Sequence, residues 1–146
     1  MRIGIPAEVK PMEGRVALVP EAAGELVRVG HEVFVQAGAG DKSGYPDSAY
    51  EAQGIRVVAD ARALYDRAQL VVKVKEPIAS EYELLRADHL LFSYLHLAAV
   101  PELARVLQAK GLTAVAFETV EVRGQLPLLA PMSDIAGRLA VQIGAH

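Results

Sequence analysis

The 146-residue sequence predicts an α/β fold: a Rossmann-like, doubly wound and mostly parallel sheet with helices on both faces. The main observation is that short apolar runs alternate with helical patterns along the chain, which is the order of βαβ units. A second is the placing of boundary residues. Pro20 and Pro101 suit first helical positions, and Gly30, Gly54 and Gly111 suit positions just past a helix end.

The apolar runs predict six strands, at 2–5, 32–36, 56–58, 70–75, 90–94 and 113–117. Helical patterns between them cover 20–29, 47–53, 61–67, 81–85 and 101–109, with Asp47 and Asp60 as expected N-caps. After the last strand, 118–129 reads as an excursion with a short hairpin around Arg123-Gly124. A helix is expected from about Ser133, its N-cap, with an apolar stripe of Ile135, Leu139 and Ile143.

Composition excludes several classes of function. The net charge of −3 and the absence of a basic stripe argue against a nucleic-acid partner. With no cysteine, disulfides and thiolate metal sites are impossible, and we predict no metal site. The start MRIGIP is not a signal peptide, and no apolar run approaches the ~18 residues of a membrane span. We therefore expect a cytoplasmic protein without a membrane partner.

Polar side chains follow several predicted strands, where parallel sheets bind ligands. Lys75 ends the run VVKVKEP, and its ammonium group could contact a carboxylate or carbonyl oxygen, form a Schiff base with a keto substrate, or simply reach solvent. Lys73, two residues earlier, is expected on the same face and deeper, in a supporting role. His96, beside Tyr94 after the next strand, is a candidate proton carrier.

Arg15 lies in a loop after the first strand, as do Glu8 and Lys10. Its guanidinium is either a surface charge or a planar fork for a substrate carboxylate. His31 and His89 begin strands and are expected to be structural or exposed. The glycine-rich stretch AGAGDKSG at 37–44 lacks G-x-G-x-x-G spacing, and the next helix begins only after Tyr45-Pro46. We therefore reject it as a dinucleotide site.

Four stretches carry a family resemblance: RIGIPAEVKPMEGRVALVP, VVKVKEP, LFSYLHLA and LLAPMSDIAGRLAVQIGAH. Over the whole chain, the sequence resembles the N-terminal part of alanine dehydrogenases, in a family shared with the nicotinamide nucleotide transhydrogenase and saccharopine dehydrogenases. The resemblance implies oxidation of L-alanine by NAD and water to pyruvate, ammonia and NADH. It also implies a homo-oligomer, commonly a hexamer.

The resemblance implies roles for individual residues. Arg15 would bind the substrate carboxylate, Lys75 would contact the carboxylate and carbonyl oxygens, and His96 would be the general acid/base. Tyr94 and Glu8 would line the pocket. Met132 and Ser133 would lie near the nicotinamide of NAD.

Members of this family are well over twice as long as this chain. We therefore expect residues 1–132 to be a substrate domain and 133–146 a helix leading toward an absent NAD-binding domain, which would hold most of the cofactor. Such a fragment should be inactive alone. The alternatives are a nucleotide-binding domain of a proton-translocating transhydrogenase and a non-enzymatic α/β binding module.

Overall fold

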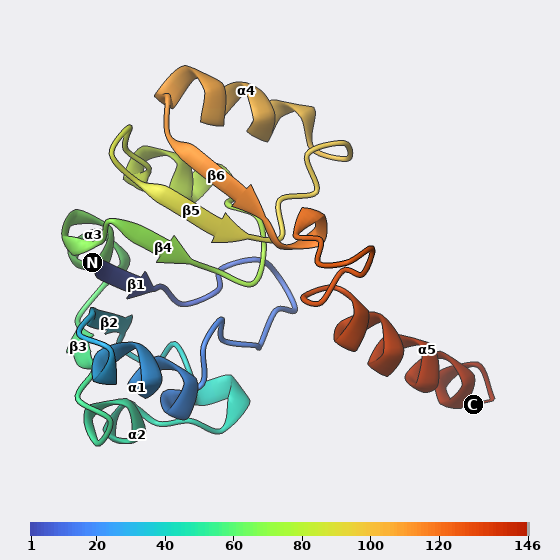
Figure 1. Ribbon diagram of the computed structural model, residues 1–146, viewed down its shortest axis with the longest axis horizontal. Coiled ribbons are helices and arrows are strands. Elements are labelled where there is room, and N and C mark those ends of the chain that lie inside the picture. The colour runs from blue at the N-terminus through green and yellow to red at the C-terminus, as the bar shows by residue number, and fades with distance from the viewer. Residues whose placement is uncertain (146) are drawn as a thin grey trace.

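A computed structural model describes residues 1–145 and confirms the α/β fold (Figure 1). Six parallel strands form one sheet in the order β3-β2-β1-β4-β5-β6. The chain runs outward from the centre to one edge, crosses back, and runs outward to the other edge, which is the doubly wound arrangement. The strands are β1 (Arg2–Ile5), β2 (Glu32–Gln36), β3 (Arg56–Val58), β4 (Leu70–Val72), β5 (Leu90–Ser93) and β6 (Thr113–Ala116).

Helices cover the two faces of the sheet because successive strand residues point to opposite sides. One core joins Val71 and Leu91 to α3 (Ala61–Arg67), to the 3-10 helix η2 (Ala79–Leu84) and to α4 (Pro101–Lys110). The other joins Ile3, Val33 and Val72 to α1 (Pro20–Arg28) and α2 (Asp47–Glu51). The near-continuous apolar runs of the central strands are thus explained by burial on both sides.

Boundary residues account for where the helices begin and end. The Asp60 carboxylate accepts a hydrogen bond from Ala63 N at 2.8 Å, which confirms it as the N-cap of α3. Gly30, Gly54 and Gly111 have φ of 90°, 79° and 68° just past helix ends, a conformation that glycine adopts without a steric penalty. Asp47 is not an N-cap: it is the first residue of α2, and its carboxylate instead accepts from Gly38 N at 2.9 Å.

The second face of the sheet is only partly covered. α1 and α2 pack over β1, β2 and β3, whereas a hollow of about 390 Å³ opens beside them over β4 and β5. Its lining is almost entirely apolar and includes Leu70, Val72, Phe92, Phe117, Leu128 and Met132. We call this region the apolar hollow.

The tail departs from the sheet. Val122 and Gln125 form a two-residue hairpin bridge, with Arg123 and Gly124 at φ of 52° and 76°, as expected. Helix α5 (Ala130–Gly144) begins three residues before the predicted start, so Ser133 lies in its first turn and is not its N-cap. The helix projects away from the sheet (Figure 1).

The apolar stripe of α5 is exposed to solvent. Ile135, Leu139 and Ile143 are 60%, 47% and 74% exposed. Within residues 1–145, no helix combines the length and apolarity that crossing a bilayer requires.

Candidate functional site

A pocket of about 270 Å³ lies beyond the carboxyl ends of the central strands. Loops after three different strands supply its polar wall, and the start of α5 supplies the opposite wall. The structure thereby brings together six of the residues singled out in the sequence. The lining consists of Arg15, Lys75, Tyr94, His96, Leu129, Met132, Ser133 and Ala136.

Arg15 is oriented by a carboxylate that sequence reasoning missed. Its Nε and NH2 donate to the two oxygens of Glu13 at 2.8 and 2.7 Å, and its backbone N donates to the same group at 2.9 Å. These hydrogen bonds lower the pKa of Glu13 to about 2, so its carboxylate stays ionised. NH1 lies 3.3 Å from Met132 Sδ, and both residues line the pocket.

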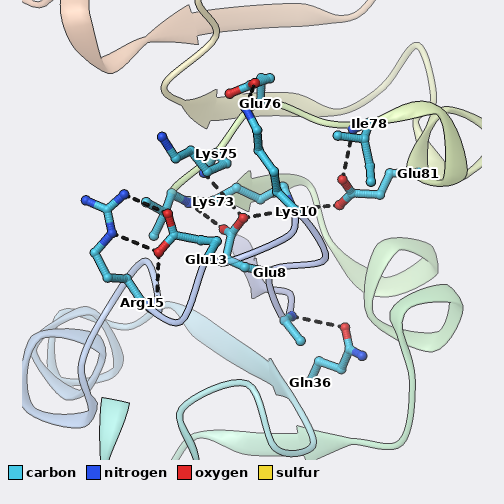
Figure 2. Close-up of polar contacts among 12 residues, drawn as sticks. Glu8, Lys10, Glu13, Arg15, Gln36, Lys73, Lys75, Glu76, Ile78 and Glu81 are labelled. Atoms are coloured by element: carbon cyan, nitrogen blue, oxygen red, sulfur yellow. Dashed lines mark hydrogen bonds and ion pairs between the residues drawn. The ribbon is translucent and has the colours of Figure 1, made fainter. Parts of the chain in front are cut away.

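Lys75 is half-buried, and within the described part of the chain its Nζ has no hydrogen-bond or ion-pair partner. Its backbone is fixed instead. The Glu8 carboxylate accepts from Val74 N at 2.6 Å and from Lys75 N at 3.3 Å (Figure 2). The ammonium group is therefore available to a ligand while its attachment point is held.

Glu8 does not line this pocket; it lies behind it. Besides the two amides, its carboxylate is 3.5 Å from Lys73 Nζ, and it borders a smaller hollow of about 100 Å³ with Glu13 and Lys42. Burial raises the pKa of Glu8, and the Lys73 ammonium together with the two amide donors acts against that rise.

Lys73 does not share the pocket with Lys75, contrary to the expectation from strand alternation. Strand β4 ends at Val72, so the two-residue period no longer applies to 73–75. Lys73 is fully buried, and its Nζ binds Glu81 at 2.6 Å (Figure 2). Glu81 also accepts from Tyr65 OH at 3.2 Å. This is a buried structural cluster beneath the site.

Tyr94 and His96 form the third side of the pocket, with their rings stacked at a centroid distance of 5.9 Å. The Tyr94 hydroxyl donates to Leu128 O at 2.6 Å, which ties the site to the tail, and burial raises its pKa. His96 Nδ1 lies 3.2 Å from Glu76 Oε2. The backbone of His96 is held by the Glu118 carboxylate, which accepts from its N at 2.7 Å.

Other candidate residues lie outside the pocket. His89 is buried, with Nε2 3.0 Å from Tyr65 O and Nδ1 accepting from Arg86 N at 3.1 Å, so it is structural. The glycine-rich stretch contains a 3-10 helix, η1 (Asp41–Ser43), and α2 starts only at Asp47. Within residues 1–145, no cluster of three or more histidine or acidic side chains could hold a metal ion.

The pocket can bind a small organic anion. Arg15 and Lys75 face it together with the His96 imidazole. Arg15 is paired with the Glu13 carboxylate and His96 with that of Glu76, whereas Lys75 Nζ has no acidic partner among residues 1–145. The apolar side chains of Leu129, Met132 and Ala136 face these polar groups. Such a pairing favours a charged carboxylate on one side and an uncharged group on the other.

Comparison with known proteins identifies the family to which the chain belongs. The family model for "Alanine dehydrogenase/PNT, N-terminal domain" matches residues 4–136. The alanine dehydrogenase of Bacillus subtilis (strain 168) is 52% identical over 100% of this chain and 38% of that protein. The alanine dehydrogenase of Mycobacterium tuberculosis is 50% identical over 100% of this chain and 40% of that protein.

Solved structures agree. A structure of an L-alanine dehydrogenase superposes with a TM-score of 0.95 at 51% identity, over 99% of this chain and 40% of that one. The transhydrogenase from Sinorhizobium meliloti superposes with a TM-score of 0.76 at 33% identity, over 81% of this chain and 34% of that one. The chain thus spans about 40% of the length of these relatives.

Proposed function

This chain belongs to the alanine dehydrogenase/PNT family, in which it corresponds to the N-terminal domain, and from that premise we propose that it forms the substrate-binding half of an NAD-dependent alanine dehydrogenase. The substrate pair is L-alanine and pyruvate. The observation that carries the proposal is the convergence of Arg15, Lys75 and His96 in one pocket of about 270 Å³.

Each polar side chain has a distinct task in this scheme. Arg15 presents to the substrate carboxylate the guanidinium N–H groups that Glu13 does not engage, because Glu13 accepts from Nε and from one N–H of NH2. Lys75 directs its free ammonium group at the carboxylate and the carbonyl oxygen, and so stabilises negative charge on that oxygen. His96 takes and returns the proton as water adds to the imine carbon and ammonia leaves.

The start of α5 provides the wall against which the nicotinamide ring of NAD would lie. Met132 and Ser133, flanked by Leu129 and Ala136, offer a largely apolar surface suited to a flat ring. When bound, NAD supplies the acceptor for the hydride from the alanine Cα. The sequence has no G-x-G-x-x-G loop, so a second domain would hold the pyrophosphate. Residues 1–132 would then form the substrate domain, with 133–146 leading toward that second domain.

Pyruvate binding to the chain itself tests the proposal. We expect pyruvate to shift amide NMR signals around residues 15, 75, 94 and 96, and Arg15→Ala to weaken this binding roughly tenfold or more, since a charge-assisted contact is lost. Arg105→Ala is the matched control, because Arg105 also pairs with a nearby glutamate, Glu102, but on the outer surface of α4. Shifts scattered over the whole domain, or equal losses in both variants, would contradict the site.

Turnover is a separate test. The chain alone should form no NADH from alanine and NAD, because the acceptor is not held against the substrate. Once it is joined to a cofactor domain, His96→Ala should lower kcat by about 10²- to 10⁴-fold, the contribution of a general acid/base. Near-normal alanine oxidation by that variant would contradict the role of His96. The joined protein is expected to be a homo-oligomer, a hexamer by analogy with the family.

A transhydrogenase domain is the second candidate, favoured by the 33% identity to the Sinorhizobium meliloti protein. It would bind nicotinamide nucleotide without needing pyruvate. Pyruvate binding that depends on Arg15 would therefore distinguish the two functions. Alanine oxidation after joining to a cofactor domain would distinguish the enzyme from a non-enzymatic binding module.

A further inference from the structure

The two ring nitrogens of His96 lie in different surroundings. Nδ1 is 3.2 Å from Glu76 Oε2, whereas Nε2 has no hydrogen-bond partner within residues 1–145. The His96 side chain is 44% exposed and lines the substrate pocket, while that of Glu76 is only 6% exposed. The ring is therefore held at one nitrogen from inside the protein and open at the other.

Glu76 is itself held as an acceptor. Lys10 Nζ binds its other oxygen, Oε1 (Figure 2). Burial works to raise the pKa of Glu76, but its hydrogen bonds, that from Lys10 first, outweigh burial and keep the pKa below its usual value. An ionised carboxylate can only accept hydrogen bonds. Nδ1 must then be the donor, which assigns the proton of the neutral imidazole to Nδ1 and the lone pair to Nε2.

The backbone of His96 is fixed independently. His96 has φ of 48°, a left-handed conformation that is unfavourable for a non-glycine residue. The Glu118 carboxylate, from the 3-10 helix η3 (Phe117–Thr119) after β6, accepts from His96 N at 2.7 Å and from Leu95 N at 3.2 Å. Ala99 N and Val100 N donate to His96 O at 2.8 and 3.1 Å. The ring and the backbone thus have separate anchors.

We propose that Glu76 is a positioning residue for His96: it fixes the Nδ1–H tautomer, so that Nε2 alone exchanges protons in the substrate pocket. The catalytic meaning of this arrangement rests on the proposed function. As water adds to the imine carbon, one water O–H bond breaks and its proton moves to Nε2. The imidazolium then has Glu76 as its counter-ion and returns the proton to the amine nitrogen of the adduct. As the C–N bond breaks and ammonia leaves, the C=O bond of pyruvate forms and the hydroxyl proton passes to Nε2.

The tautomer is directly measurable in the chain as it stands. Long-range ¹H–¹⁵N NMR spectra of the imidazole rings, recorded near pH 8.5 where histidines are neutral, distinguish Nδ1–H from Nε2–H. A His96→Gln spectrum assigns the signals. We expect His96 to be mostly Nδ1–H. His89 serves as an internal reference with the opposite tautomer, because its Nε2 donates to Tyr65 O and its Nδ1 accepts from Arg86 N.

A pair of variants isolates the carboxylate. Glu76→Leu should reduce the ratio of Nδ1–H to Nε2–H at His96 by roughly tenfold or more, because a charge-assisted hydrogen bond is lost. Lys10→Met removes the other partner of Glu76 and should leave His96 mostly Nδ1–H. A wild-type His96 that is mostly Nε2–H, or an unchanged ratio in Glu76→Leu, would overturn the inference. The wild-type spectrum decides the question even if Glu76→Leu does not fold.

Pyruvate added to the same labelled samples tests the proposed function separately. If pyruvate does not bind but the tautomers follow the expected pattern, the proposed function fails and the positioning of His96 by Glu76 stands. If pyruvate binds near Arg15 and Lys75 while wild-type His96 is Nε2–H, the proposed function stands and the positioning role fails.

Discussion

Two lysines separated by one residue have opposite environments, and this difference governs what each can do. Lys73 lies between Glu8 and Glu81 with 1% of its side chain exposed, whereas Lys75 Nζ is free to meet a ligand. A buried cation is needed to offset buried carboxylates, and its removal leaves them uncompensated. The ammonium group of Lys75 offsets no buried carboxylate, so its removal should not destabilise the fold.

We therefore predict that Lys73→Met destabilises the chain by about 3–5 kcal/mol, the cost of breaking a buried ion pair. Lys75→Met is the matched control and should change the free energy of unfolding little, while abolishing detectable pyruvate binding. Urea denaturation followed by circular dichroism measures the first effect and NMR titration the second. Equal destabilisation by both variants would contradict the division of roles.

His89 makes stability depend on pH. Burial is the largest cause of its lowered pKa, and Arg86 adds to it. In the unfolded chain this histidine takes up a proton near its ordinary pKa of 6.5, whereas the folded chain resists protonation. Its contribution is fully present above that pH and is lost as the pH falls below it.

We predict that the urea midpoint drops between about pH 7.5 and about pH 5.5, and drops less in His89→Asn. Asparagine keeps an acceptor near Arg86 N but does not titrate. The variant is expected to be less stable overall, since the bond from Nε2 to Tyr65 O is lost. An identical drop in both proteins would assign the pH dependence to other groups.

At the scale of elements, β1 and α3 touch so closely that a glycine is required between them. A Cβ added to Gly4 would lie 2.8 Å from Leu64 Cδ2 and 2.9 Å from Ala68 Cβ. We predict that Gly4→Ala costs about 1–3 kcal/mol of stability through overpacking, as measured by thermal or urea unfolding. A neutral result would mean that α3 shifts without penalty.

In helix α5, a glycine-to-alanine substitution is expected to stabilise the chain. Gly137 lies within the helix, and nothing is within 4 Å of an added Cβ. Gly137→Ala should stabilise α5 locally by about 0.8–1 kcal/mol, the difference in helix propensity. Slower amide hydrogen exchange around 137–142 would show this. Unchanged exchange there would mean that α5 does not open independently of its surroundings.

For the whole molecule, regular patterns predicted the fold well. The first residues of all six strands and the N-cap Asp60 followed from apolar runs and boundary residues. Three strand ends were less accurate: the runs at 70–75, 90–94 and 113–117 continue beyond β4, β5 and β6. Buried residues such as Val74 and Tyr94 extend the pattern after the first two of these strands have ended. The predicted ends of β1, β2 and β3 are correct, so the pattern locates a strand end where the apolar run stops with the strand.

Site partners that are distant in sequence could not be predicted. Glu8 binds the backbone at Val74 from 66 residues away, and Glu76 meets His96 from 20 residues away. Grouping polar residues by the strands they follow placed Arg15, Lys75 and His96 at one edge, but it could not tell a ligand-facing side chain from one that supports it. Glu13, two residues from Arg15, carried the one local signal that was missed.

The apolar hollow over β4 and β5 leaves apolar side chains in contact with water in a folded chain. Hydrophobic dyes such as anilinonaphthalene sulfonate usually brighten only when a protein is partly melted. In this protein we expect such dyes to bind the native state, in the apolar hollow beside Phe92 and Phe117. Strong dye fluorescence from this chain would therefore indicate binding to the apolar hollow, and should not be taken as a sign of misfolding.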